Sequence, residues 1–301
     1  MAISAREGRN TMGSNDTLTT STVSAADGTT ISFRTVGHGP GLILLPGALL
    51  TAQDFDGLAR ALGDRGFTVH TLDRRGRGES GPQGPQYSAE LECHDIATVQ
   101  AKTGATFIVG HSFGGFLTLE AMSAGQQYRR AALYEPGVLL GGHGPVSLTW
   151  TRRCQRELDV GRPLAAFLTF IRGVNPETTG RVPRPLLRLI ILAAVRRRER
   201  HRHYAVLGSA IAEHEEAARL GNQPGRYIRI TVPTLMMVGK DLGKTAVGQV
   251  VTELAALVPA ARMLTFAKLD HFGPQKAPEE VADAIRAFFL DDQVGPAEAT
   301  V

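Results

Sequence analysis

The stretch 108–115, with the sequence IVGHSFGG, constrains the fold of this chain more than any other feature. Apolar residues lead into it, Ser112 stands at its centre, and a long amphipathic segment follows. This pattern predicts a strand, a sharp turn and a helix, with Ser112 at the turn. Gly110 and Gly114 flank the serine, where side chains would clash as one backbone passes close to another. The hydroxyl is expected to be exposed above the carboxyl end of the strand, beside the positive end of the helix.

The turn resembles the nucleophile elbow, GxSxG, of the α/β-hydrolase family. The stretch 73–80, DRRGRGES, is similar to the Asp-x-Arg-Gly-x-Gly-x-Ser turn of the same family. We expect its charged groups to tie loops together and assign them no chemistry. The resemblance implies an α/β-hydrolase fold, in which helices flank a mostly parallel eight-stranded sheet and an all-helical cap is inserted over the active site.

The rest of the chain is consistent with this organisation. Stretches rich in Thr, Val and Ile at 19–25 and 29–36 predict a hairpin around Asp27-Gly28. After about residue 137 the alternation of strand and helix stops, and four helical patterns follow, near 146–158, 162–173, 184–200 and 203–219. We predict a disordered tail at 1–18, a core formed by 19–136 and 223–291, a helical cap at 137–222 and a C-terminal tail at 292–301.

One predicted cap helix is apolar on nearly every side. Its large aliphatic residues are Leu186, Leu187, Leu189, Ile190, Ile191 and Leu192. A helix of this kind is expected to be buried. We therefore predict that it packs against both the core and the neighbouring cap helices.

Acyl transfer at neutral pH requires a nucleophile, a base, an orienting acid and hydrogen-bond donors for the oxyanion. Ser112 is the candidate nucleophile. The resemblance implies that the base lies in the loop after the last strand, where His271 is the only histidine beyond His214. It also implies that the oxyanion is bound by the backbone amides of Ala48 and Phe113. In the loop that contains Ala48, Pro46 stands where the family usually has a histidine, whereas the glycine that follows it in the family is retained as Gly47.

The acid has two candidates. The family usually places it three residues beyond the glycine that ends the predicted strand at 231–239, but Leu242 occupies that position and Asp241 precedes it. Some subfamilies instead use an acid after the strand that ends at Tyr134, where Glu135 stands. Asp241 preserves the order Ser, Asp, His along the chain, so we prefer it and retain Glu135 as the alternative.

Composition narrows the possible partners. The net charge is +4, and the densest basic cluster, 196–203, has only Tyr204 nearby, which favours a solvated helix face over a nucleic-acid site. Cys93 and Cys154 form no CxxC motif, so neither a disulfide framework nor a metal site is indicated. Residues 1–20 lack the apolar core of a signal peptide, and no stretch approaches the ~18 apolar residues that span a bilayer. We expect a cytoplasmic protein without a cofactor, a nucleic-acid partner or a membrane partner.

These features predict a serine hydrolase that acts on a small-molecule ester, lactone or thioester through an acyl-enzyme. Two other functions are compatible with the fold. One is a non-hydrolytic enzyme, such as a cofactor-free lyase, a cyclase or a haloperoxidase-like enzyme. The other is a ligand-binding protein whose catalytic residues are inactive. The sequence does not distinguish among oligomeric states.

Overall fold

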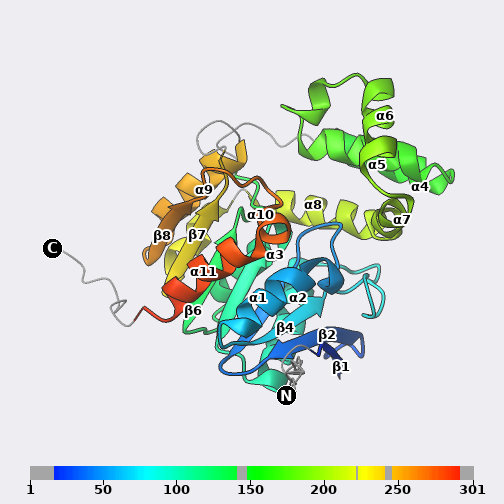
Figure 1. Ribbon diagram of the computed structural model, residues 1–301. Coiled ribbons are helices and arrows are strands. Elements are labelled where there is room, and N and C mark those ends of the chain that lie inside the picture. The colour runs from blue at the N-terminus through cyan, green and yellow to red at the C-terminus, as the bar shows by residue number, and fades with distance from the viewer. Residues whose placement is uncertain (1–16, 141–147, 222, 241–245, 292–301) are drawn as a thin grey trace, which may run out of the picture.

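The computed structural model describes residues 17–140, 148–221, 223–240 and 246–291. Eight strands form one sheet in the order β1-β2-β4-β3-β5-β6-β7-β8 (Figure 1). The first two pairings, β1 with β2 and β2 with β4, are antiparallel, and the others are parallel. The strands are β1 (Thr19–Ser24), β2 (Thr30–Gly37), β3 (Gly41–Leu45), β4 (Thr68–Asp73), β5 (Phe107–His111), β6 (Arg130–Tyr134), β7 (Thr234–Val238) and β8 (Ala261–Thr265).

Helices cover both faces of the sheet and bury two separate apolar clusters. One cluster lies beneath α2 (Ala89–Thr103), α3 (Phe113–Ser123) and α9 (Ala246–Leu257). The other lies beneath α1 (Asp56–Asp64) and α11 (Pro278–Phe289), which contact each other. Strands buried on both sides account for the continuous apolar runs of β3 and β5. The remaining core elements are η1 (Ala52–Phe55), η4 (Pro224–Arg229) and α10 (Gly273–Lys276).

The predicted α/β-hydrolase fold is confirmed. The hairpin at Asp27-Gly28 is also present, with Gly28 at a φ of 82° that favours glycine and Asp27 accepting a hydrogen bond from the Thr29 amide. The predicted tails lie almost entirely outside the described residues. None of the helices in the described ranges is long and apolar enough to cross a lipid bilayer.

Between β6 and β7 the described chain is helical. We call residues 148–221 the helical insert. Its elements are α4 (Thr149–Asp159), α5 (Pro163–Val174), η3 (Thr179–Arg181), α6 (Arg184–Ala194), α7 (Arg197–Ala205) and α8 (Leu207–Gly221). The single helix predicted over 184–200 is therefore two helices. The chain is extended at Val195, and the Arg200 guanidinium donates hydrogen bonds to the carbonyls of Leu192 and Val195, at the end of α6.

The prediction that the apolar helix packs against both the core and the neighbouring cap helices is wrong for the core, since α6 contacts its neighbour α5 but is mostly exposed. On α6 only Leu187 is buried, whereas Leu186, Leu189, Ile190 and Leu192 are exposed. Figure 1 shows the cause, since α6 lies at the outer edge of the insert, beyond α5 and away from the sheet. Its outer face therefore meets no other element in the described part of the chain.

Candidate active site

Ser112 stands between β5 and α3 in a strained conformation, with φ 51° and ψ −120°. Its amide donates a hydrogen bond to the Tyr134 carbonyl over 3.0 Å, and its carbonyl accepts one from the Gly137 amide over 2.7 Å. The flanking glycines are sterically required. A Cβ on Gly110 would lie 2.6 Å from the Gly114 carbonyl oxygen, and one on Gly114 would collide with the backbone of Leu45. The strand–turn–helix predicted from the sequence is therefore present.

Backbone strain is concentrated at one edge of the sheet. Among the described residues, three that are not glycine have a positive φ, namely Leu49 (61°), Ser112 (51°) and Glu135 (44°). They follow β3, β5 and β6, which are consecutive in the parallel part of the sheet. Such conformations cost about 1–3 kcal/mol each and persist where the surroundings hold them, often at functional sites. The carboxyl edge of these three strands is therefore the candidate site.

The loop that carries His271 is fixed to the ends of three strands. The Lys240 amide, after β7, donates a hydrogen bond to the Leu269 carbonyl over 2.8 Å. The Tyr134 hydroxyl, at the end of β6, donates to the Asp270 carbonyl over 2.8 Å. His111, at the end of β5, binds the His271 carbonyl through Nε2 over 2.8 Å. Because these contacts converge on 269–271, the loop returns to the elbow although it lies far from it in the sequence.

His111 anchors the loop that carries His271. It is buried, and its Nε2 must carry the proton because a carbonyl can only accept a hydrogen bond. Burial and the neighbouring His271 lower the pKa of His111 to about 3, so the ring is neutral at neutral pH. The ring centroids of His111 and His271 are 4.8 Å apart, which places the His271 imidazole beside the residue that precedes Ser112.

Glu135 is the carboxylate that contacts His271. Its Oε2 lies 2.7 Å from His271 Nδ1, and its Oε1 accepts a hydrogen bond from the Gly239 amide over 2.8 Å. The side chain of Glu135 is largely buried, with 9% exposed, whereas 37% of the His271 side chain is exposed. Because a carboxylate only accepts hydrogen bonds, Nδ1 carries the proton of a neutral His271 ring, and Nε2 is left as the basic nitrogen.

Asp241, the acid preferred from the sequence, lies outside the described residues. The geometry favours the alternative, Glu135. The sequence contained one relevant signal, because Glu135 directly follows the strand next to β5 in the sheet. The preference for Asp241 followed the usual chain order of the family, and it stays a prediction because the structure does not describe that residue.

The two candidate oxyanion donors come from the residue after Ser112 and from the loop that follows β3. Within the described residues, the amides of Ala48 and Phe113 have no hydrogen-bond acceptor. Phe113 is the first residue of α3, so its amide is one of the unpaired donors of a helix N-terminus. The adjacent Gly47 allows close approach, because a Cβ there would lie 2.9 Å from the Ser112 Cβ.

Two arginines of the 73–80 turn hold the loop that contains Ala48. The Arg74 guanidinium donates to the carbonyls of Pro46 (3.1 Å) and Gly47 (3.2 Å), and the Arg77 guanidinium to those of Gly47 (3.1 Å) and Leu50 (3.2 Å). Both side chains are almost fully buried. The turn therefore ties loops together, as expected, and the loop that it holds is the one beside the serine.

A carboxylate from the helical insert completes this cluster. Glu213 of α8 is fully buried, pairs with Arg77, and has Oε1 3.1 Å from Arg74 Nη1. Burial alone would raise the pKa of Glu213, but the charges of Arg74 and Arg77 outweigh it, and the pKa lies below its ordinary value. Glu92 of α2 also pairs with Arg74 over 2.8 Å. Buried charges thus link the insert to the loop beside Ser112.

We expect Glu213→Ala to lower the free energy of unfolding by about 3 kcal/mol, because the substitution leaves a buried guanidinium without its main partner. Chemical denaturation followed by far-UV circular dichroism measures the change. Glu215→Ala is the matched control, since Glu215 lies on the same helix but is exposed, and the expected change is within about 0.5 kcal/mol. Equal effects of the two substitutions would contradict a structural role for the buried pair.

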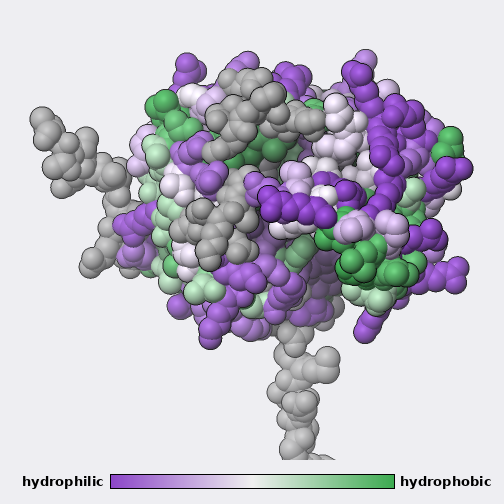
Figure 2. Space-filling model, turned by 90° about the horizontal axis from the view of Figure 1, so that it is seen from above, coloured by the Kyte–Doolittle hydropathy of each residue, from purple (hydrophilic) through white to green (hydrophobic). Residues whose placement is uncertain are grey.

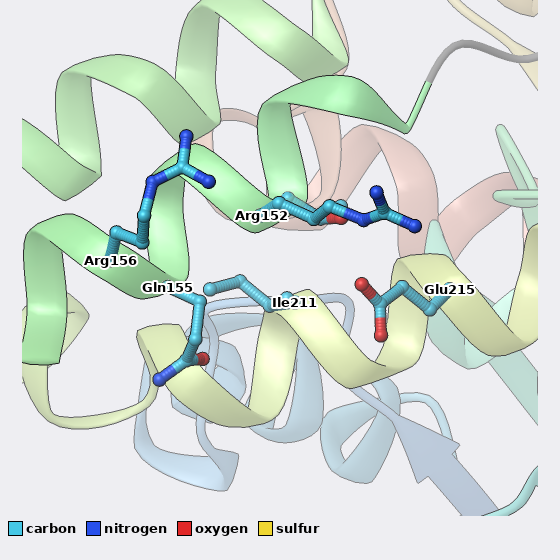
Figure 3. A pocket seen from close by; sticks show the side chains of 6 residues that line it. Arg152, Gln155, Arg156, Ile211 and Glu215 are labelled. Atoms are coloured by element: carbon cyan, nitrogen blue, oxygen red, sulfur yellow. The ribbon is translucent and has the colours of Figure 1, made fainter.

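A groove of about 340 Å³ lies between α4 and α8 of the insert (Figure 3). Its lining residues are Thr151, Arg152, Gln155, Arg156, Ile211 and Glu215. In Figure 3 the side chains of Arg152, from α4, and Glu215, from α8, point toward each other at one end of it. No residue of the elbow or of the 269–271 loop lines this groove, so we assign it no catalytic part.

The chain matches the model of the alpha/beta hydrolase family over residues 42–284. It is similar to a non-heme haloperoxidase from Rhodococcus erythropolis, with 36% identity over 95 residues, which are 31% of this chain and only 35% of that protein. Among solved structures, an alpha/beta hydrolase from Sphaerobacter thermophilus DSM 20745 superposes with a TM-score of 0.75 at 32% identity, covering 89% of this chain and all of that one. An esterase from Exiguobacterium antarcticum shares the fold, with a TM-score of 0.67 at 19% identity over 89% of this chain and 98% of that one. With most of its length matched by the family model, the chain belongs to the alpha/beta hydrolase family.

Proposed function

We propose that this protein is a serine hydrolase that cleaves a small-molecule ester, lactone or thioester through an acyl-enzyme. The observation that carries the proposal is the 2.7 Å contact between Glu135 Oε2 and His271 Nδ1, beside a serine in a strained strand-to-helix turn. A carboxylate that orients an imidazole, with a serine on a nearby strained turn, supports nucleophilic acyl transfer.

Each residue has a defined role in the proposed reaction. His271 removes the proton of the Ser112 hydroxyl through Nε2, and the serine oxygen attacks the acyl carbon. Glu135 orients the imidazole and stabilises the imidazolium that forms. The amides of Ala48 and Phe113 donate hydrogen bonds to the oxyanion, each contributing on the order of 3 kcal/mol to the stabilisation of the transition state. The imidazolium then protonates the leaving group, and water releases the acyl group from Ser112.

We further propose that the helical insert is a cap over this site, as the family resemblance implies. Its helices contact the loops that leave the carboxyl edge of the sheet. His203 Nδ1 lies 3.2 Å from the Leu49 carbonyl oxygen, and Glu216 accepts a hydrogen bond from the Ala89 amide over 3.0 Å. Ala48 and Leu49 pack against the apolar cluster of the insert, which includes Phe167 and Leu207. A substrate bound between these surfaces would be shielded from water at the reacting carbon.

One comparison favours a second candidate function. The similarity to a non-heme haloperoxidase extends over about a third of both chains. If hydrogen peroxide replaced water as the acceptor of the acyl group, the same acyl-enzyme would yield a peracid, which oxidises a halide while it returns to the acid. This activity would use the same three side chains and requires a carboxylic acid and peroxide as co-substrates.

Labelling with a fluorophosphonate probe, combined with assays of p-nitrophenyl esters, tests these proposals. Stoichiometric labelling at Ser112 together with ester turnover supports the hydrolase. Labelling without turnover of any ester, but with peroxide-dependent halogenation of monochlorodimedone, favours the second candidate. A protein that is neither labelled nor active would be a ligand-binding protein, and both enzymatic proposals would fail.

A further inference from the structure

The outer face of α6 is an exposed aliphatic surface. Leu186, Leu189 and Ile190 are 49%, 65% and 45% exposed, and Leu192 is 39% exposed. The first three have the i, i+3, i+4 spacing that places side chains on one side of a helix. Single exposed aliphatic residues are ordinary, but a contiguous group on one helix face indicates contact with an apolar partner.

Exposed arginines border this surface. Arg188 lies within α6, and Arg196, Arg197 and Arg198 follow its C-terminal end; all four are exposed. In the part of the chain that the structure describes, none of them has an ion pair or a hydrogen-bonded side-chain partner. Other arginines nearby are already engaged, since Arg184 pairs with Glu157 and Arg202 with Asp54.

The excess of positive charge in this chain is concentrated in the segment that contains α6, residues 137–222. Residues 137–222 contain fourteen arginines and seven acidic residues, whereas the rest of the chain has slightly more acidic than basic residues. Figure 2, which looks onto this end of the molecule, shows a hydrophobic patch on the side of the insert, bordered by hydrophilic residues. A basic, partly apolar surface is thus presented on the side opposite the sheet.

Three occupants are conceivable, and the chemistry favours one of them. A nucleic acid binds arginines through its phosphates, and single strands also stack their bases on aromatic side chains, but neither contact uses the exposed aliphatic residues of this surface. A second copy related by two-fold symmetry would bring the same patch, and thus the same unpaired arginines, against itself. A membrane surface with anionic lipids supplies both an apolar layer for the aliphatic side chains and negative charge for the arginines.

We propose that the surface formed by Leu186, Leu189, Ile190 and Leu192, together with Arg188 and Arg196–Arg198, docks this protein on an anionic lipid surface. Helix α6 then lies in the plane of the interface with its outer face in the acyl region, and the arginines contact the headgroups. The expectation of no membrane partner rested on the lack of a long apolar stretch in the sequence, which does not bear on docking of this kind. The proposal is independent of the proposed catalytic function.

Co-sedimentation with lipid vesicles tests the proposal. The full chain is mixed with vesicles of phosphatidylcholine alone, or of equal parts phosphatidylcholine and phosphatidylglycerol. We expect binding to the anionic vesicles only, weakened by high salt because the charges are exposed. Replacing Arg196, Arg197 and Arg198 with Gln should lower the partition coefficient roughly a hundredfold. Replacing Leu189 and Ile190 with Gln should lower it at least about tenfold.

Ile228→Gln is the matched control. Ile228 is also a large aliphatic residue, 56% exposed, but lies on η4 outside the insert, and its substitution should leave binding unchanged. All of these positions are exposed, so circular dichroism and thermal melting should be unaltered in every variant. Failure of the unsubstituted protein to bind anionic vesicles would overturn the proposal, as would binding that the α6 substitutions do not change. A dimer in sedimentation velocity that dissociates in the Leu189→Gln, Ile190→Gln variant, without vesicle binding, would instead assign this surface to a second copy.

Discussion

Replacing Ser112 with alanine is expected to lower the turnover of an ester substrate by about 10⁵-fold or more. The reason is that the serine oxygen forms the covalent bond of the proposed acyl-enzyme, so the substitution removes the reaction path rather than one stabilising contact. The amides of Ala48 and Phe113 remain in place, so residual activity above that of water is expected. Steady-state kinetics on a p-nitrophenyl ester measures the loss of turnover. The fluorophosphonate probe measures the loss of labelling that is expected with it.

The matched control for this experiment is Ser123→Ala. Ser123 is the last residue of α3, the helix that follows Ser112, and its hydroxyl makes one long hydrogen bond of 3.4 Å to the Arg226 carbonyl. Its substitution should leave turnover and labelling unchanged. A loss of only about tenfold in Ser112→Ala, with the fold intact, would show that Ser112 is not the nucleophile.

Local sequence signals were sufficient for the elements whose geometry depends on neighbouring residues. The elbow around Ser112 is an example, because the two glycines can be read directly as positions where backbones pass closely. The hairpin at Gly28 is another, since a turn with a positive φ strongly favours glycine. In both cases the physical constraint acts within a few residues, so the sequence carries it without knowledge of the tertiary structure.

Features that depend on distant packing were not predictable in the same way. The apolar pattern of α6 suggested packing against both the core and the other helices of the insert, but the elements that surround a helix are set by the arrangement of the whole insert. The partner of His271 is a similar case. Its position depends on the strand order and on the Gly239 amide, which binds Glu135 Oε1, and neither is visible in the spacing of acidic residues along the chain.

Glu135→Gln is the second substitution for which we expect a large effect, a fall in turnover of about 10⁴-fold. Both carboxylate oxygens of Glu135 act as acceptors, one for the Gly239 amide and one for His271 Nδ1. Glutamine has only one acceptor oxygen, so its amide nitrogen must face one of these two donors. If it faces His271, Nδ1 becomes the acceptor and the proton moves to Nε2, which can then no longer take the proton of Ser112.

Asp241→Asn distinguishes between the two acids considered from the sequence. If Glu135 orients His271, this substitution should leave turnover close to that of the unsubstituted protein, whereas Glu135→Gln should not. The reverse pattern, a large loss in Asp241→Asn and a small one in Glu135→Gln, would make Asp241 the acid and Glu135 a structural carboxylate. Thermal melting of both variants separates loss of catalysis from loss of fold. Unchanged labelling of Ser112 in Glu135→Gln would also count against the proposed role, because the probe reacts with a serine that a correctly oriented imidazole has activated.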